Sequence, residues 1–126
     1  MPRITSKISI KGNGSVIQRI RTAPRFRIFT VVKGGSLTLN RVRIRGGYDA
    51  SRRTGPNRGG GAILNFGVVV INNSIISQNT STFAGGAIAS TGIVTINKTW
   101  ITANTTINRV RGGGAGGAIY SRNPLP

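Results

Sequence analysis

Short runs in which apolar and polar residues alternate occupy most of this chain, and one such run is repeated. Residues 59–79 (GGGAILNFGVVVINNSIISQN) return as residues 85–104 (GGAIASTGIVTINKTWITAN) after a shift of 25 positions. Alternation with a period of two is typical of a β-strand that buries one face. No stretch has the 3.6-residue period of a helix. The pattern therefore predicts an all-β protein built from repeats.

Three copies of the repeat align when Gly35, Gly67 and Gly92 are superposed, so that successive copies are 32 and 25 residues apart. Residues 8–14 (ISIKGNG) and 116–121 (GGAIYS) look like further, partial copies. We expect the aligned apolar residues to stack copy upon copy in a common core. They form three columns, which are Leu37/Val69/Val94, Leu39/Ile71/Ile96 and Ile44/Ile76/Ile101.

Glycine and asparagine recur where the predicted strands end. Gly47, Asn79 and Asn104 share one aligned position, and both residue types tolerate left-handed backbone dihedrals. We therefore predict that the chain turns a corner there, with positive φ at two or more of the three residues. Strand and corner alternate and return in register after each copy, which predicts a parallel β-solenoid.

The repeat resembles those of two groups of bacterial proteins. "GGAI" followed by "G-x-V/L-x-I/L-N-x-x-x-I" and a closing Asn is similar to the repeats of chlamydial polymorphic outer-membrane proteins and of adhesin-like bacterial surface proteins. The resemblance covers residues 28–121, and the segment SKISIKGNGSVIQR suits a first coil. It implies one domain over residues 1–126, a right-handed parallel β-helix of about four to five coils.

The same resemblance suggests a cell-surface or extracellular location. The first residues, MPRITSKISIKGNG, contain no apolar core of a secretory signal, and the longest apolar stretch, FGVVVI, is too short to span a bilayer. The localisation is therefore left unassigned.

Charge divides the chain into two halves. It has 18 Lys and Arg residues against 1 acidic residue, a net charge of +17. Fourteen of the cations lie in residues 1–58 and four in residues 59–126. Such an excess favours a polyanionic neighbour: nucleic acid, an acidic glycan or an acidic protein. We expect the basic first half to contact it, and residues 59–126 to form the more regular repeats.

Arginine is concentrated in two places of the basic half. In NRVRIRGG, Val42 and Ile44 are expected to point inward and the intervening arginines outward. The segment 48–58 (YDASRRTGPNR) interrupts the repeat and is expected to project as a basic loop. The guanidinium fork suits phosphate, sulfate or carboxylate. The predicted polyanion-binding residues are Arg41, Arg43, Arg45, Arg52, Arg53 and Arg58.

Two apolar residues occupy an outward position of the repeat. Trp100 aligns with Ile75 and, one copy earlier, with Arg43. An outward tryptophan beside an outward isoleucine suggests a contact with a partner. The alternative is a contact with a neighbouring corner loop of the same chain.

Catalytic chemistry has few candidates. The chain contains no His, no Cys, no Glu and a single acidic residue, Asp49. A carboxylate pair, a histidine-based triad and a calcium cluster each need more than that. We therefore expect no catalytic residue, no metal site, no cofactor and no enzymatic activity.

Three functions remain. The first is a structural solenoid module that assembles with copies of itself or in a larger complex and sets its basic half against a polyanion. The second is a nucleic-acid-associated protein that binds phosphates by charge and shape, and the third is a glycan-binding surface module. Assembly is expected because a solenoid has an unpaired strand edge at each end.

Overall fold

The computed structural model describes residues 3–50, 58–107 and 117–121, and all regular structure in these ranges is β-strand. No helix there is long and apolar enough to cross a membrane. The strands are β1 (Arg3–Ile4), β2 (Lys7–Gln18), β3 (Phe29–Val31), β4 (Ser36–Arg45), β5 (Tyr48–Asp49), β6 (Ile63–Asn65), β7 (Val68–Asn72), β8 (Ile75–Ser77), β9 (Thr80–Ser81), β10 (Ile88–Ser90), β11 (Ile93–Asn97), β12 (Trp100–Thr102), β13 (Thr105–Thr106) and β14 (Ile119–Ser121).

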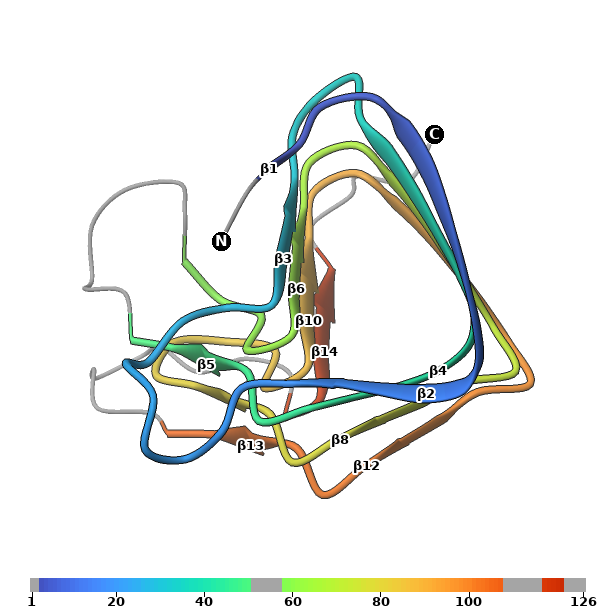
Figure 1. Ribbon diagram of the computed structural model, residues 1–126. Helices are drawn as coiled ribbons and strands as arrows, with labels where there is room; N and C mark the ends of the chain where they lie inside the picture. The colour runs from blue at the N-terminus through green and yellow to red at the C-terminus, as the bar shows by residue number, and fades with distance from the viewer. Residues whose placement is uncertain (1–2, 51–57, 108–116, 122–126) are drawn as a thin grey trace.

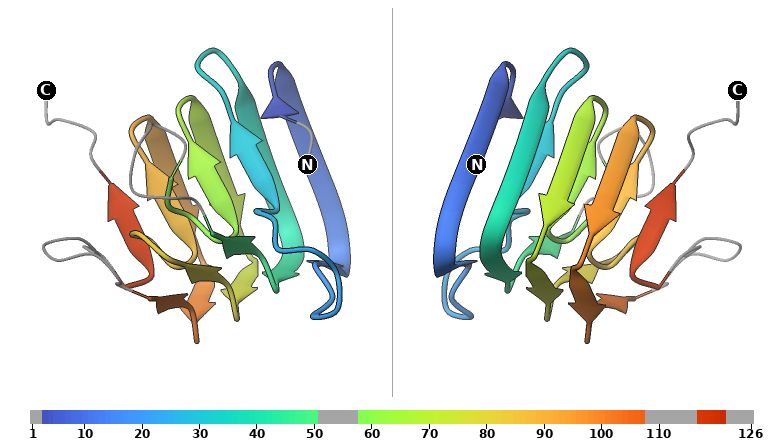
Figure 2. Two further views of the ribbon diagram at one scale, coloured as in Figure 1. Left: turned by 90° about the vertical axis from the view of Figure 1, so that its left-hand side faces the viewer. Right: turned by 90° about the vertical axis from the view of Figure 1, so that its right-hand side faces the viewer.

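The chain winds into a solenoid of roughly triangular cross-section (Figure 1). Every strand pair is parallel, and one sheet has the order β1-β3-β6-β10-β14, so five strands mark about four turns. In Figure 1 the chain runs clockwise while it moves away from the viewer, and Figure 2 shows the coils stacked side by side. The structure thus confirms the predicted right-handed parallel β-solenoid.

We number the coils by their strands. The first coil is residues 3–28, the second contains β3 to β5, the third β6 to β9 and the fourth β10 to β13, while β14 begins a fifth.

The second sheet bends around one corner of the triangle, and a small third sheet follows it. The first half of β4 pairs with β7 and its second half with β8, while β2 pairs with both halves of β4. The small sheet has the order β5-β9-β13. Strands β2 and β4 are therefore longer than β7 and β11 of the later coils, because the pairing between β2 and β4 continues around this corner.

The three predicted columns are stacked in the core. Leu37, Val69 and Val94 are direct register partners, and the other two columns are paired in the same way. Their members in the second and third coils are fully buried, whereas Val94, Ile96 and Ile101 are partly buried and pack against the same cluster. The alternation in the sequence thus identified the inward face correctly.

The corners deviate by one residue from the prediction. Positive φ occurs at Gly46 (79°), Gln78 (55°) and Ala103 (54°), which directly precede Gly47, Asn79 and Asn104. The prediction of positive φ at the latter three residues is therefore wrong, although the three do occupy equivalent positions.

Asparagine at these positions bonds across the coils instead. The Asn79 Oδ1 atom accepts from the backbone N–H of Gly47 at 2.9 Å, and Asn104 Oδ1 accepts from that of Asn79 at 3.1 Å. The Asn79 Nδ2 group donates to the carbonyl of Ser77 at 2.9 Å. The amide satisfies backbone groups that the corner removes from the strand ladder, which explains why asparagine recurs there.

Candidate polyanion-binding surface

The predicted arginines of β4 are exposed, but they do not form one straight row. Arg43 and Arg45 lie on either side of the buried Ile44 and point outward. Arg41 lies on the corner, with φ of 54°. Arg45 Nε donates to Gln18 Oε1 at 2.7 Å, which ties the second coil to the first. The basic row is therefore shorter than expected and is continued around the corner by Arg41.

The insert begins later than the sequence suggested. Tyr48 and Asp49 form β5 and pair with Thr80 and Ser81, so they belong to the repeat. The guanidinium carbon of Arg58 lies 3.9 Å from the centroid of the Phe83 ring, a cation–π distance. The two further predicted arginines of the insert, Arg52 and Arg53, lie outside the described residues.

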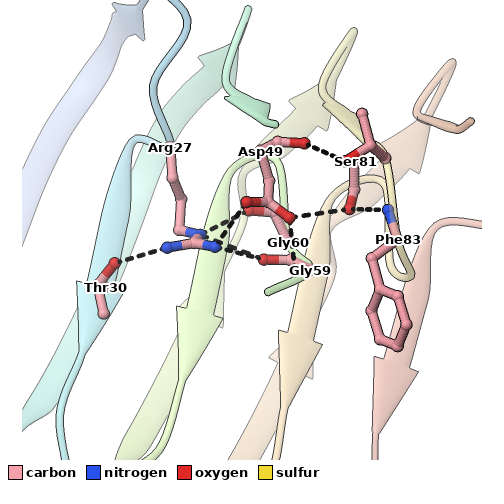
Figure 3. Close-up of polar contacts among 8 residues, drawn as sticks. Arg27, Thr30, Asp49, Gly59, Gly60, Ser81 and Phe83 are labelled. Atoms are coloured by element: carbon pink, nitrogen blue, oxygen red, sulfur yellow. Dashed lines mark hydrogen bonds and ion pairs between the residues drawn. The ribbon is translucent and has the colours of Figure 1, made fainter. Parts of the chain in front are cut away.

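The single acidic residue lies inside the protein and has a structural role (Figure 3). Asp49 is 4% exposed and forms an ion pair of 2.9 Å with Arg27 Nη2. Its carboxylate also accepts hydrogen bonds from the backbone N–H of Gly59 and the hydroxyl of Ser81. Arg27 Nε donates to the carbonyl of Gly60 at 3.0 Å. Asp49 thereby connects β5, β9 and the chain that follows the insert.

Burial shifts the pKa of Arg27 more than the charge of Asp49 does. Desolvation lowers the pKa of Arg27 from its usual value, and the charge of Asp49 opposes this shift only in part. The ion pair uses the only negative side chain of the protein, so none is left to offset the cations on the surface. Sequence reasoning did not find this pair; a lone acid beside a strand in so basic a chain was the available signal.

The sequence also did not reveal a cleft that lies beside the small third sheet. Gln18, Arg45 and Ser77 are register partners, so Ile20 stands where the next two coils have Gly47 and Asn79. Asn79 Oδ1 accepts from the backbone of the second coil at this corner, but Gly47 has no side-chain amide that could do the same for the first coil. Residues 19–25 leave the coil there, and the chain returns at Phe26, whose carbonyl accepts from the backbone N–H of Tyr48 at 2.9 Å.

The cleft between this segment and the second coil has a volume of about 960 Å³. Tyr48 lies at its wall, and the guanidinium carbons of Arg25 and Arg19 lie 4.5 and 5.9 Å from the centroid of its ring. Arg19 also donates to the carbonyls of Gly46 at 2.7 Å and Ala23 at 3.0 Å. No acidic residue lines the cleft, whose cationic residues are Arg19, Arg21, Arg25 and Arg45.

The predicted partner residues are adjacent on the surface. Trp100 and Ile75 are register partners in β12 and β8, and Ile75 is in turn paired with Arg43, as the alignment predicted. Trp100 is 74% exposed, whereas Ile75 is partly buried. Within the described residues, β12 pairs only with β8, so Trp100 lies on the outermost strand of its sheet.

Comparisons of this chain with protein families, with curated proteins and with solved structures found no match. Function must therefore be inferred from the surface itself. Within residues 3–50, 58–107 and 117–121, no group of three or more His, Cys, Asp or Glu residues could hold a metal ion. The arginine-rich surface of the first two coils is the strongest chemical feature that the structure describes.

Proposed function

We propose that this protein is a non-enzymatic structural β-solenoid module whose basic first two coils bind a polyanion. The observation that carries the proposal is the separation of charge along the solenoid axis. Residues 3–28 hold seven cationic side chains and residues 29–50 hold four, whereas residues 58–107 hold only Arg58 and Lys98. The one negative side chain, Asp49, is buried against Arg27.

The cations of the basic coils lie close enough together to repel one another. Alternate residues of a strand lie about 6.6 Å apart, so Arg43 and Arg45, which both point outward from β4, are closer together than the Debye length of about 8 Å at physiological salt. They repel one another, and this repulsion opposes folding. A polyanion relieves this repulsion, and its binding releases small cations that are condensed around the polyanion, so binding and solenoid stability are expected to support each other.

Self-association is the second part of the proposal. Strands β11 and β12 are each paired on one side only within the described residues, and their inward residues Val94, Ile96 and Ile101 are partly exposed. Strand β2 presents inward residues in the same columns at the opposite end. A second copy stacked head to tail would continue these columns and would place a strongly basic end against a less basic one.

Two alternatives stay open. A nucleic-acid-associated protein would use the same arginines on phosphates, by charge and shape. The resemblance of the GGAI repeats to those of chlamydial polymorphic outer-membrane proteins and adhesin-like surface proteins supports a glycan-binding module instead. Binding to a neutral glycan through hydroxyl contacts would not depend strongly on salt, whereas binding to a polyanion would.

Fluorescence anisotropy with three labelled probes tests the proposal: a 20-nucleotide single strand, a heparin oligosaccharide and a neutral dextran. If about four ion contacts form, the affinity for the single strand falls about 50-fold between 50 and 200 mM NaCl. Absence of binding to both anionic probes at 50 mM NaCl, or salt-independent binding to dextran, would overturn the proposal.

Sedimentation velocity tests the assembly. With the anionic probe present we expect species larger than a one-to-one complex, and at low salt without the probe we expect a monomer. Replacement of Trp100 by serine is expected to reduce the larger species, since Trp100 lies on the strand at which a second copy would add. One-to-one complexes at every protein concentration would contradict self-association and leave polyanion binding intact.

A further inference from the structure

We infer that the cleft between residues 19–25 and the second coil is a binding site for a run of closely spaced phosphate groups on a single flexible chain. The inference rests on the proposed function and gives it a location and a ligand chemistry. It involves Arg21 and Arg25, which sequence reasoning did not select.

The first step is the charge of the cleft. Four guanidinium groups line it without a carboxylate, and Asp49, the next residue after Tyr48, faces Arg27 instead. Each charge in such a concave site strengthens the field of the others, since the low-dielectric walls focus it. A ligand with several negative charges at short spacing fits this field better than a single small anion.

The second step separates the residues that build the cleft from those that face a ligand. Arg19 donates to three backbone carbonyls and so holds the segment in place. Arg45 lines the cleft and is exposed, and its Nε donates to Gln18 while its guanidinium has two further amino groups that can donate. Arg21 is exposed, and Arg25 is exposed above the Tyr48 ring. The side chains available to a ligand are thus those of Arg21, Arg25 and Arg45.

The third step concerns the chemistry of the ligand. All cations of the cleft are arginines, although the chain also contains lysine. The planar fork of arginine binds two oxygens of one phosphate, which a lysine ammonium does not do. Guanidinium groups already lie over Tyr48, so its ring is not free to stack with a base. The site therefore fits the phosphates of a nucleic acid rather than its bases.

The fourth step concerns size. A volume of about 960 Å³ lies at the upper end of the range of about 300–1,000 Å³ that is usual for small-ligand sites. A site of this size suits a few nucleotides of a single strand or a nucleoside polyphosphate. These two sources share the same chemistry, phosphates a few ångströms apart on a flexible chain.

The experiment compares two pairs of substitutions that remove the same charge. R21Q/R25Q removes two cations from the cleft, and K33Q/K98Q removes two cations outside it. Binding of a labelled ten-residue oligothymidylate, of inorganic tripolyphosphate and of a heparin oligosaccharide is measured at 100 mM NaCl. Circular dichroism and urea unfolding verify that each variant is folded; both arginines are exposed, so we expect unchanged unfolding midpoints.

We expect R21Q/R25Q to weaken oligothymidylate binding at least 20-fold and to reduce the salt slope by about 1.4, the value for two lost contacts with a single strand. K33Q/K98Q should weaken it no more than about threefold. Tripolyphosphate should compete with the oligonucleotide for the wild-type protein but not for R21Q/R25Q. The conservative pair R21K/R25K should bind the oligothymidylate about fivefold more weakly than the wild-type protein, because lysine keeps the charge but lacks the planar guanidinium fork.

Each of the other possible results of this experiment overturns a particular part of the inference. Equal losses in R21Q/R25Q and K33Q/K98Q would show diffuse binding, which overturns the cleft and leaves the proposed function standing. Tighter binding of the heparin oligosaccharide, with the larger loss in R21Q/R25Q, would assign the cleft to sulfate and overturn the phosphate assignment. If R21K/R25K binds the oligothymidylate as tightly as the wild-type protein does, recognition by the planar guanidinium fork is overturned. A wild-type protein that binds none of the probes would overturn the proposed function itself.

Discussion

The third and fourth coils have nearly the same sequence pattern, but they differ in how deeply their residues are buried. In β7 the inward residues Val69 and Ile71 are fully buried, whereas the equivalent Val94 and Ile96 of β11 are only partly buried. Strand β8 differs from β12 in the same way, and Trp100 of β12 is far more exposed than its partner Ile75.

Neighbouring strands account for this difference. Strands β7 and β8 of the third coil are paired on both sides, with β4 on one side and β11 or β12 on the other. Within the described residues, β11 and β12 are paired on one side only. In a solenoid each coil supplies part of the core of the next, so position in the stack decides how much a given side chain contributes.

The largest contrast is expected in the column of Ile76 and Ile101. Substitution I76A removes a fully buried side chain with layers on both sides, and should lower the free energy of unfolding by about 4 kcal/mol. I101A removes the same atoms from a half-covered position and should cost about 1.5 kcal/mol. Urea unfolding followed by circular dichroism measures both values. Equal losses would mean that the fourth coil is as well covered as the third.

A smaller contrast is expected in the inner asparagine ladder. Asn79 is fully buried, and N79V leaves the Gly47 N–H and the Ser77 carbonyl without their partner, at a cost of about 3 kcal/mol. Asn104 is partly exposed, so water can replace its amide in N104V and the cost should be about 1 kcal/mol. The unfolding midpoints in urea give the comparison, and a larger loss for N104V would contradict the ladder.

The smallest expected effect is that of glycine at the positive-φ corner residue, and it should be the same in the third and fourth coils. Gln78 and Ala103 have φ of 55° and 54° and are both exposed. Glycine there relieves about 1 kcal/mol of left-handed strain, while its greater freedom in the unfolded chain takes back about half of that. Q78G and A103G should each stabilise by about 0.5 kcal/mol in thermal unfolding. If one substitution stabilises the protein and the other destabilises it, tertiary packing rather than local backbone strain determines the stability change at this corner.

Periodicity in the sequence was sufficient to predict the fold class and the three core columns. It also placed Trp100 beside Ile75, because a repeat that returns in register fixes lateral neighbours as well as inward faces. The corner was misplaced by one residue because glycine and asparagine were read for their backbone freedom. Asn79 in fact serves through its amide, while Gln78 takes the strained dihedral.

The cleft could not be predicted from the repeat because it arises where the repeat fails. Ile20 at a corner position signals a missing turn, but the sequence does not say where the released segment goes. The path of residues 19–25 depends on Arg19 reaching the carbonyls of Gly46 and Ala23, which is long-range information. The role of Asp49 was missed for the same reason, since Arg27 lies 22 residues away.

The burial of Asp49 has a consequence for how this protein can be regulated. The chain has no histidine and no cysteine, the side chains that commonly gain or lose protons near neutrality. Its other ionisable side chains are those of arginine, lysine and tyrosine. Side-chain protonation is thus a poor control over such a surface. If the proposed polyanion binding is correct, it should be weakened by ionic strength, by competing anions or by the addition of a negatively charged group to the chain.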